Sequence, residues 1–461
     1  MAERQFNDRL ASVLAETGWS NAGLARRVND ECRARGVPRS YAPTSVANWL
    51  SGMVPASPVP EVLAHLFAQR LDRPVTLTDL GYAEDVSLDL GLTWEATVRG
   101  TVNTVAKLWR IDMERRAVLL NSAWLASAFA APTREWLLDW ATDDTSHAGA
   151  RCIGAAEIEA VWDMGRTFAD ADNRLGGGYA RTTLVHYLNQ VVLPMLDGTY
   201  SEAVGRQLLA ATARLCELAG FMAFDSGPQH QGLAQRYYIQ GLRLAQASRD
   251  RALGSNILAD MAMQAHYLGN PTEAISLARA SQRAALEAGS YANVARGAAV
   301  ETRAHALHGD GASCADAMTR AEQALDRVKP AQEPSWLETQ WFTFEPVQAY
   351  FTYAAAELGR PGEVQSFARP VLETPSDMAR QRVLVTAALA GSYVPTSERT
   401  DGDIDKACAT LAETRPLVQV LTTKRGIEAV NAVRRKLAPY RDQAPVRELE
   451  ESFLPLIGAA A

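Results

Sequence analysis

Apolar residues recur at spacings of three and four along almost the whole chain, as Leu10, Val13 and Leu14 do near its beginning. This spacing places them on one face of an α-helix, whereas the period-two alternation that marks a half-buried strand is scarce. The pattern therefore predicts an all-α protein. Because the chain has 461 residues, of which 47% are hydrophobic, we expect two or three domains with substantial cores.

Related helix-pair motifs recur in the second half of the chain. AMQAHYLGNPTEAISLAR (262–279) is followed by VETRAHALHGDGASCADAMTR (300–320), and their glycines, Gly269 and Gly309, lie 40 residues apart. A third motif, YAAAELGRPGEVQSFAR, places Gly359 a further 50 residues on. Helix pairs that repeat at this interval predict an α-solenoid, in which each pair buries its apolar face against its neighbours.

These units resemble tetratricopeptide repeats. In the first unit Gly269 ends the first helix, and small residues fall where the two helices pack, at Ala262, Ala274 and Ala278. Gly220 is the expected crossing residue of an earlier, longer unit. The resemblance implies a tetratricopeptide-like solenoid.

The segment PTSVANWLSG (43–52) has the features of a DNA recognition helix. Val46, Trp49 and Leu50 fall on one apolar face, which leaves short polar side chains on the other. Short hydroxyl and amide groups near the start of a helix can reach base edges in the major groove, and an amide can contact adenine through two hydrogen bonds. The predicted base-contacting residues are Thr44, Ser45 and Asn48.

Basic residues around this helix are candidates for contacts with DNA phosphates. Residues 1–80 hold nine arginines and eight acidic residues, so they carry +1 of the net charge of −7 and the rest of the chain carries −8. The remaining residues assigned to the DNA-binding surface are Arg26, Arg27, Arg39 and Tyr41. The alternative is a helical packing module with an ordinary solvated surface.

A series of motifs makes the chain similar to a known family. In order they are LARRVN, GVPRSYAPTSVANWLSG, RLGGGYAR, YLNQVVLPMLDGTYSE and AQRYYIQGLRLAQASRDRALGSNILADMAMQAHYLG. The chain resembles actinobacterial transcriptional regulators that join a xenobiotic-response-element-type helix-turn-helix to a tetratricopeptide-like body. The resemblance implies a DNA-binding head, a sensor or partner-binding body, and a link to development or secondary metabolism. The family usually has a basic segment after the recognition helix, whereas WLSGMVP (49–55) is neutral here, which weakens the expected phosphate contacts.

Clusters of turn-forming residues mark the domain boundaries. The strongest, RPVTLTDLGYAEDVSLDLG (73–91), separates a series of short helices from a run of long ones. We therefore expect a helix-turn-helix domain at 1–85, a helical bundle at 86–200 and the solenoid at 201–461.

Within the bundle the periodicity predicts four helices, at 94–106, 112–130, 155–171 and 181–196. The run GGG (176–178) lacks the Lys-Ser/Thr of a phosphate loop, and we expect it to form a tight turn between helices.

Solenoids of this kind line their concave surface with the first helix of each pair. The register predicts a mixture of aromatic, Met, amide and charged side chains there, suited to an extended peptide or a small acidic molecule. The predicted groove residues are Glu217, Phe221, Phe224, Asn256, Met263, His266, Tyr267, Arg296, Arg303 and Tyr353. An equal alternative is that Arg296 and Arg303 pair with acidic residues of the next repeat.

The sequence contains no recognisable catalytic or metal-binding pattern. Its five cysteines lie far apart without a CxxC pair, and its seven histidines include no HExxH motif. We therefore expect no enzyme activity, no metal and no cofactor. The charged beginning, MAERQFNDRL, and the short apolar stretch AWLASAFAA (123–131) predict a cytoplasmic protein without a membrane-spanning segment.

Two functions are compatible with these features. The first is a transcriptional regulator, expected to be a homodimer, which binds operator DNA under the control of a peptide, small molecule or protein in the solenoid groove. The alternative is a protein-interaction scaffold with a weakened or vestigial helix-turn-helix. The neutral WLSGMVP segment is the feature that separates them.

Overall fold

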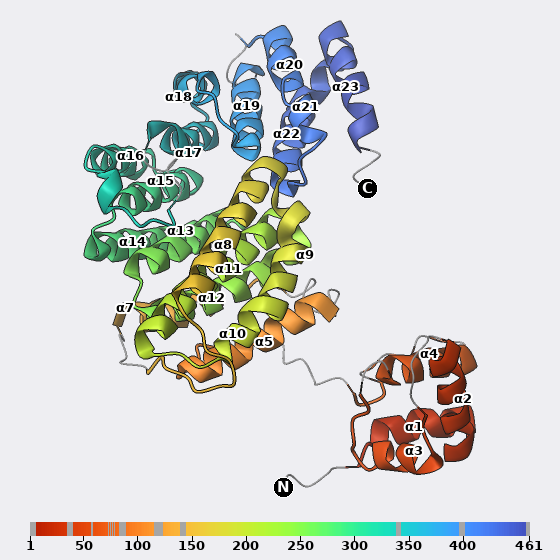
Figure 1. Ribbon diagram of the computed structural model, residues 1–461. Coiled ribbons are helices and arrows are strands. Elements are labelled where there is room, and N and C mark those ends of the chain that lie inside the picture. The colour runs from red at the N-terminus through yellow and green to blue at the C-terminus, as the bar shows by residue number, and fades with distance from the viewer. Residues whose placement is uncertain are drawn as a thin grey trace. The chain divides into compact units, whose positions relative to one another are not determined.

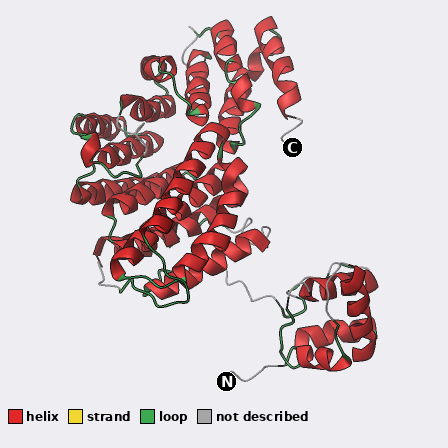
Figure 2. Cartoon of the chain, in the orientation of Figure 1, coloured by secondary structure: helices red, strands yellow, loops and turns green. Residues whose placement is uncertain are grey.

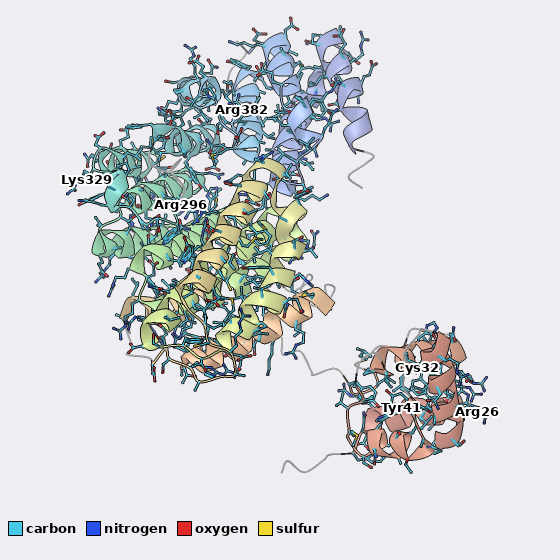
Figure 3. All side chains as sticks on the ribbon, in the orientation of Figure 1. Arg26, Cys32, Tyr41, Arg296, Lys329 and Arg382 are labelled. Atoms are coloured by element: carbon cyan, nitrogen blue, oxygen red, sulfur yellow. The ribbon has the colours of Figure 1, made fainter. Side chains whose placement is uncertain are left out.

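The computed structural model describes residues 6–34, 40–56, 59–71, 73, 75, 77, 79–82, 89–114, 123–138, 144–337, 343–395 and 402–457. These residues form helices and loops, with two isolated β-bridges and no strand among them (Figure 2). The all-α prediction is confirmed. The chain divides into two compact units, Met1–Leu88 and Asp89–Ala461, and the first of these ends close to the predicted boundary at residue 85.

In its described residues the first unit has four helices around one apolar core. They are α1 (Asp8–Thr17), α2 (Asn21–Ala34), α3 (Pro43–Leu50) and α4 (Val59–Leu71). Asn7 caps α1 by accepting a hydrogen bond from the Leu10 N–H at 3.0 Å, and its side-chain amide donates to the Leu80 carbonyl at 2.9 Å. The core includes residues from all four helices, among them Val46 and Trp49 on the inner face of α3.

The second unit begins with an extended segment that α12 (Gln231–Ser248) holds in place. The side chains of Arg236, Gln240 and Arg243 donate hydrogen bonds to carbonyl groups of residues 90–96. Because these carbonyls are engaged outside the segment, the helix predicted at 94–106 begins only at Val98 and continues to Glu114, as α5.

The prediction of a helix at 112–130 is wrong near the end of that range, where residues 123–125 are not helical. Leu125 pairs its N–H with Gln235 Oε1 at 3.0 Å and its carbonyl with Gln235 Nε2 at 2.7 Å. This side-chain pairing takes up the backbone groups that a continuous helix would use. A 3₁₀ turn (Ala126–Phe129) and α7 (Ala130–Leu138) follow.

The triple glycine lies at a tight junction, as expected. Gly176 has a φ of 85° and ends α8 (Ala155–Leu175), and Gly177 begins α9 (Gly177–Tyr187). A Cβ on Gly177 would lie 2.6 Å from the Met222 carbonyl oxygen, so only glycine allows this approach to α11 (Glu202–Asp225). The helix predicted at 181–196 therefore starts earlier, and a π turn (Leu188–Val192) separates α9 from α10 (Leu193–Leu196).

Stacked helix pairs form the middle of the second unit (Figure 1). After α11 and α12 they are α13 (Arg251–Tyr267) with α14 (Pro271–Ala288), α15 (Tyr291–His308) with α16 (Gly311–Leu325), and α17 (Phe344–Glu357) with α18 (Pro361–Glu373). Gly269, Gly309 and Gly359 join the members of three pairs with φ values of 75°, 80° and 68°. The predicted repeat of helix pairs is confirmed, because these equivalent glycines make equivalent turns.

Gly220 also lies where a close crossing was expected. A Cβ there would be 2.9 Å from the Tyr238 ring of α12.

The last helices pack back onto the earlier part of this unit (Figure 1). They are α19 (Ala379–Tyr393), α20 (Ile404–Ala412), α21 (Arg415–Val418), α22 (Lys424–Leu437) and α23 (Ala444–Ile457). Helix α19 contacts α8, and the Thr422 N–H donates to the Leu175 carbonyl at 2.8 Å. The expected division at residue 200 is therefore not observed, since residues 89–461 form one compact unit.

One helix among the described residues, α11, is long and apolar enough to cross a membrane. Within its apolar window 89% of the residues are buried, and the core helix of a globular protein satisfies the same test.

Candidate functional site

The outer face of α3 in the first unit presents short polar side chains. Thr44 and Asn48 are exposed, while Ser45 is half-buried and its Oγ accepts a hydrogen bond from the Ala42 N–H at 3.3 Å. Val46 and Trp49 lie in the core on the opposite face, as predicted. Thr44 and Asn48 are therefore accessible to a partner, and Ser45 partly serves the start of its own helix.

Tyr41 holds the loop before α3. Its N–H donates to Asn29 Oδ1 at 2.7 Å, and its carbonyl accepts from Asn29 Nδ2 at 2.9 Å. Its ring meets Trp49 edge-on, with the ring centres 5.3 Å apart. Tyr41, which was predicted to lie on the DNA-binding surface, therefore links the loop before α3 to α2 and to the core residue Trp49.

The predicted phosphate-binding arginines differ in their surroundings. Arg26 is exposed. The Arg27 guanidinium lies 4.4 Å from the centre of the Trp19 ring and donates a hydrogen bond to the Gly23 carbonyl at 3.0 Å. Arg39 lies outside the described residues. The Arg27 guanidinium is thus engaged with its own helix and with Trp19, whereas Arg26 makes no such contact among the described residues.

A cavity of about 120 Å³ lies inside the second unit. It collects side chains from α8, α11, α13, α15, α17, α19 and α22. The predicted groove residues that line it are Glu217, Phe221, Asn256, Met263, Arg296, Arg303 and Tyr353. The sequence register therefore brings seven of the ten predicted residues to one place.

The other three predicted groove residues lie close by. Phe224 meets Tyr267 edge-on with ring centres 5.4 Å apart, and Tyr267 is 39% exposed. The His266 Nε2 lies 3.1 Å from Glu357 Oε1.

Asp225 is the centre of the first ionic cluster beside this cavity. It is fully buried at the end of α11 and accepts hydrogen bonds from Arg425 Nε at 2.8 Å, Arg380 at 3.3 Å, the Thr423 hydroxyl at 2.8 Å and the Gly177 N–H at 3.1 Å. Although burial opposes ionisation, Arg380 and Arg425 hold the pKa of Asp225 below its ordinary value. The cluster joins helices α9, α11, α19 and α22.

Arg380 also pairs with Asp172 of α8 at 2.9 Å. Burial raises the pKa of Asp172, against the opposing effect of Arg380.

Arg296 forms the second ionic cluster. It is buried and donates to Asp260 Oδ1 at 2.5 Å and to the Asn256 side chain at 2.7 Å. Both partners belong to α13, so the acidic partner comes from the preceding repeat rather than from the next one. Arg303 does pair with the next repeat, through Glu357 of α17 at 2.5 Å.

Glu217 is buried in the same cluster, where Arg214 donates a hydrogen bond to one of its oxygens. Burial raises the pKa of Glu217 to about 8, against the lowering effect of Arg214 and with help from the neighbouring Asp260 carboxylate. A pKa of about 8 favours the neutral acid form of Glu217 at neutral pH, so we expect the Arg296–Asp260 pair beside it to keep its own charges in balance.

Glu217→Gln tests this protonation state. Since the folded pKa of about 8 lies above the ordinary 4.5, the wild-type protein should lose stability as the pH rises from 4.5 to about 8. The neutral variant should lack this loss and become more stable relative to wild type at high pH. Urea unfolding of both proteins at pH about 6 and about 9 measures the difference. An equal pH dependence in the two proteins would contradict a protonated Glu217.

A second cavity, of about 780 Å³, adjoins the first. Four residues line both of them: Arg303, Tyr353, Leu384 and Arg425. We call the two spaces the inner cavity and the outer cavity. Small apolar residues of α19 and α22 contribute much of the outer lining.

Sequence reasoning missed several acidic and basic residues of these two clusters. Asp225 and Asp260 lie within largely apolar helical stretches, a signal that could have marked them as buried and paired. Arg380 and Arg425 carry no such signal, because their partners lie 155 and 200 residues away in the chain.

Among the described residues, no three His, Cys, Asp or Glu side chains are placed to hold a metal ion. All five cysteines are thiols, and burial raises the pKa of Cys216.

Residues 10–83 match a protein family described as the SP15 N-terminal domain. The match covers most of the first unit and less than a fifth of the chain. No curated protein and no solved structure matches the chain.

Proposed function

We propose that this protein is a DNA-binding transcriptional regulator whose tetratricopeptide-like body senses a ligand. The observation that carries the proposal is the exposed face of α3, where Thr44 and Asn48 lie opposite the buried Val46 and Trp49. An exposed amide on a helix whose opposite face packs into the core of its unit is suited to direct contact with bases in the major groove. The resemblance to actinobacterial regulators supports the same function and a role in development or secondary metabolism.

A homodimer fits this function, because two heads on a two-fold axis would contact two half-sites of an operator. The body would then control DNA binding through the cavities described above, as a cytoplasmic sensor without catalytic activity.

The second candidate is a protein-interaction scaffold. It is favoured by the segment after α3, where Val54 is 64% exposed at a place where the family usually has basic residues. An exposed apolar side chain there would weaken attraction to phosphates and suit contact with a protein.

A genomic binding profile of the tagged protein separates the two functions. Discrete enriched sites are expected of a regulator, and a flat profile would favour the scaffold.

Asn48→Ala tests the role of α3 in reading bases. Loss of an amide that contacts adenine through two hydrogen bonds should reduce discrimination between the enriched sequence and random DNA by about 1–3 kcal/mol. Arg26→Ala should instead weaken binding to both DNAs about equally, because phosphates carry no sequence information. Fluorescence anisotropy with both DNAs measures the ratio. An unchanged ratio in Asn48→Ala would show that α3 is not the recognition helix.

A further inference from the structure

The outer cavity has the size and lining of a small-molecule site. Its volume of about 780 Å³ lies within the range of about 300–1,000 Å³ that is typical of ligand pockets. Small residues of α19 and α22 create the space, since Ala388, Gly391, Ala429 and Ala432 leave room that larger side chains would fill. Val364 and Val433 add apolar surface.

The charged groups of the outer cavity favour an anion. The charged residues of its lining are the cations Arg303, Arg360, Arg425 and Lys436 and the acids Glu357 and Glu428, an excess of +2 within the lining. Glu363 and Asp225, which lie outside the lining, pair with Arg360 and Arg425, so the ammonium of Lys436 contributes most to the positive charge. The Lys436 ammonium lies beside the cavity, about 4.0 Å from where a Cβ on Gly391 would be.

Two of these arginines stand at the boundary with the inner cavity and have hydrogen-bonding capacity left. Arg303 pairs with Glu357, while its Nε is buried without a hydrogen-bond partner. Arg425 donates its Nε–H to Asp225, and one of its terminal nitrogens faces the Met263 sulfur at 3.9 Å. A thioether is a weak acceptor, so a carboxylate would be a better partner for that nitrogen.

We propose that the outer cavity binds an amphiphilic monocarboxylic acid, with its carboxylate against Arg303 and Arg425 and its apolar chain along α19 and α22. The inference rests on the proposed function and deepens it, because it names the class of ligand that the body senses. An extended peptide fits this lining less well. Its backbone groups would need many hydrogen-bond partners, and the small apolar residues supply none from their side chains.

The test uses the full chain and three probes. Decanoate carries both the acid and the apolar chain, decanol carries the same chain without charge, and acetate carries the acid alone. Isothermal titration calorimetry should show decanoate binding at least about tenfold more tightly than either of the others.

Two variants examine the two halves of the site. Ala388→Leu should fill the outer cavity, and Arg303→Gln should remove the charge at its inner end, so that each weakens decanoate binding about tenfold. Ala315→Leu, a matched change on the exposed side of α16, should leave binding unchanged. Near-UV circular dichroism of each variant verifies its packing.

The outcomes separate the inference from the proposed function. Absence of decanoate binding, or equal binding of decanoate and decanol by the wild-type protein, overturns the inference even if DNA binding is retained. Decanoate binding that Ala388→Leu does not weaken also overturns it, since the chain would then lie elsewhere. Specific decanoate binding to a protein without discrete genomic sites supports the ligand class and overturns the regulator function.

Discussion

Asp225→Ala is expected to lower the free energy of unfolding by about 3–5 kcal/mol, because it removes the carboxylate partner of the buried Arg425 and leaves the buried Arg380 with Asp172 alone. Arg380 and Arg425 are both 8% exposed, and both pair with Asp225. The loss should be present at neutral pH. The lowered pKa of Asp225 makes its stabilising effect full above the ordinary value of 3.8, and this effect is lost as the pH falls through the folded pKa. Urea unfolding at neutral pH measures the change.

Asp197→Ala is the matched control for this prediction. Asp197 pairs with Arg99 at 2.7 Å, but the two side chains are about half exposed, so we expect a loss of at most about 1 kcal/mol. If the two variants lost similar stability, the cluster at Asp225 would not hold the last helices against the earlier ones.

Arg296→Ala is expected to destabilise the protein by about 3–5 kcal/mol. The reason is that Asp260, which is fully buried, would lose its cationic partner. Thermal unfolding followed by circular dichroism, together with urea unfolding, measures the loss.

Arg303→Ala provides the comparison within the same helix. Its ion pair with Glu357 is partly exposed, at 20% and 22% of the two side chains, so we expect a loss of about 1 kcal/mol. A double variant, Arg296→Met with Asp260→Leu, should regain most of the stability lost in Arg296→Ala, since no buried charge remains unpaired. Equal losses in the two single variants would contradict the distinction between Arg296 and Arg303.

The sequence predicted those parts of the fold that depend on neighbours in the chain. The apolar spacing gave the helical class, and Gly269, Gly309 and Gly359 gave the turns of three helix pairs. The same register brought Glu217 and Arg303 to one cavity, because positions on one face of successive helices converge when the pairs stack.

The predicted helices were wrong where side chains distant in the chain form hydrogen bonds with the backbone. Residues 90–96 and Leu125 are held by polar side chains of α12, more than a hundred residues later. Local periodicity contains no information about such a partner, so it predicted helix at both places.

The sequence by itself determined the helical class, the repeat and the inward face of the repeat. The tertiary structure alone decided which charges meet, since the two arginine partners of Asp225 lie 155 and 200 positions further along. It also decided that α19 packs against α8. The boundary between the two cavities therefore combines Arg303 of a repeat with Arg425 of the end segment. The physical reason is that helix formation follows from hydrogen bonds and apolar spacing within a few turns. The pairing of buried charges depends on the closure of the whole unit.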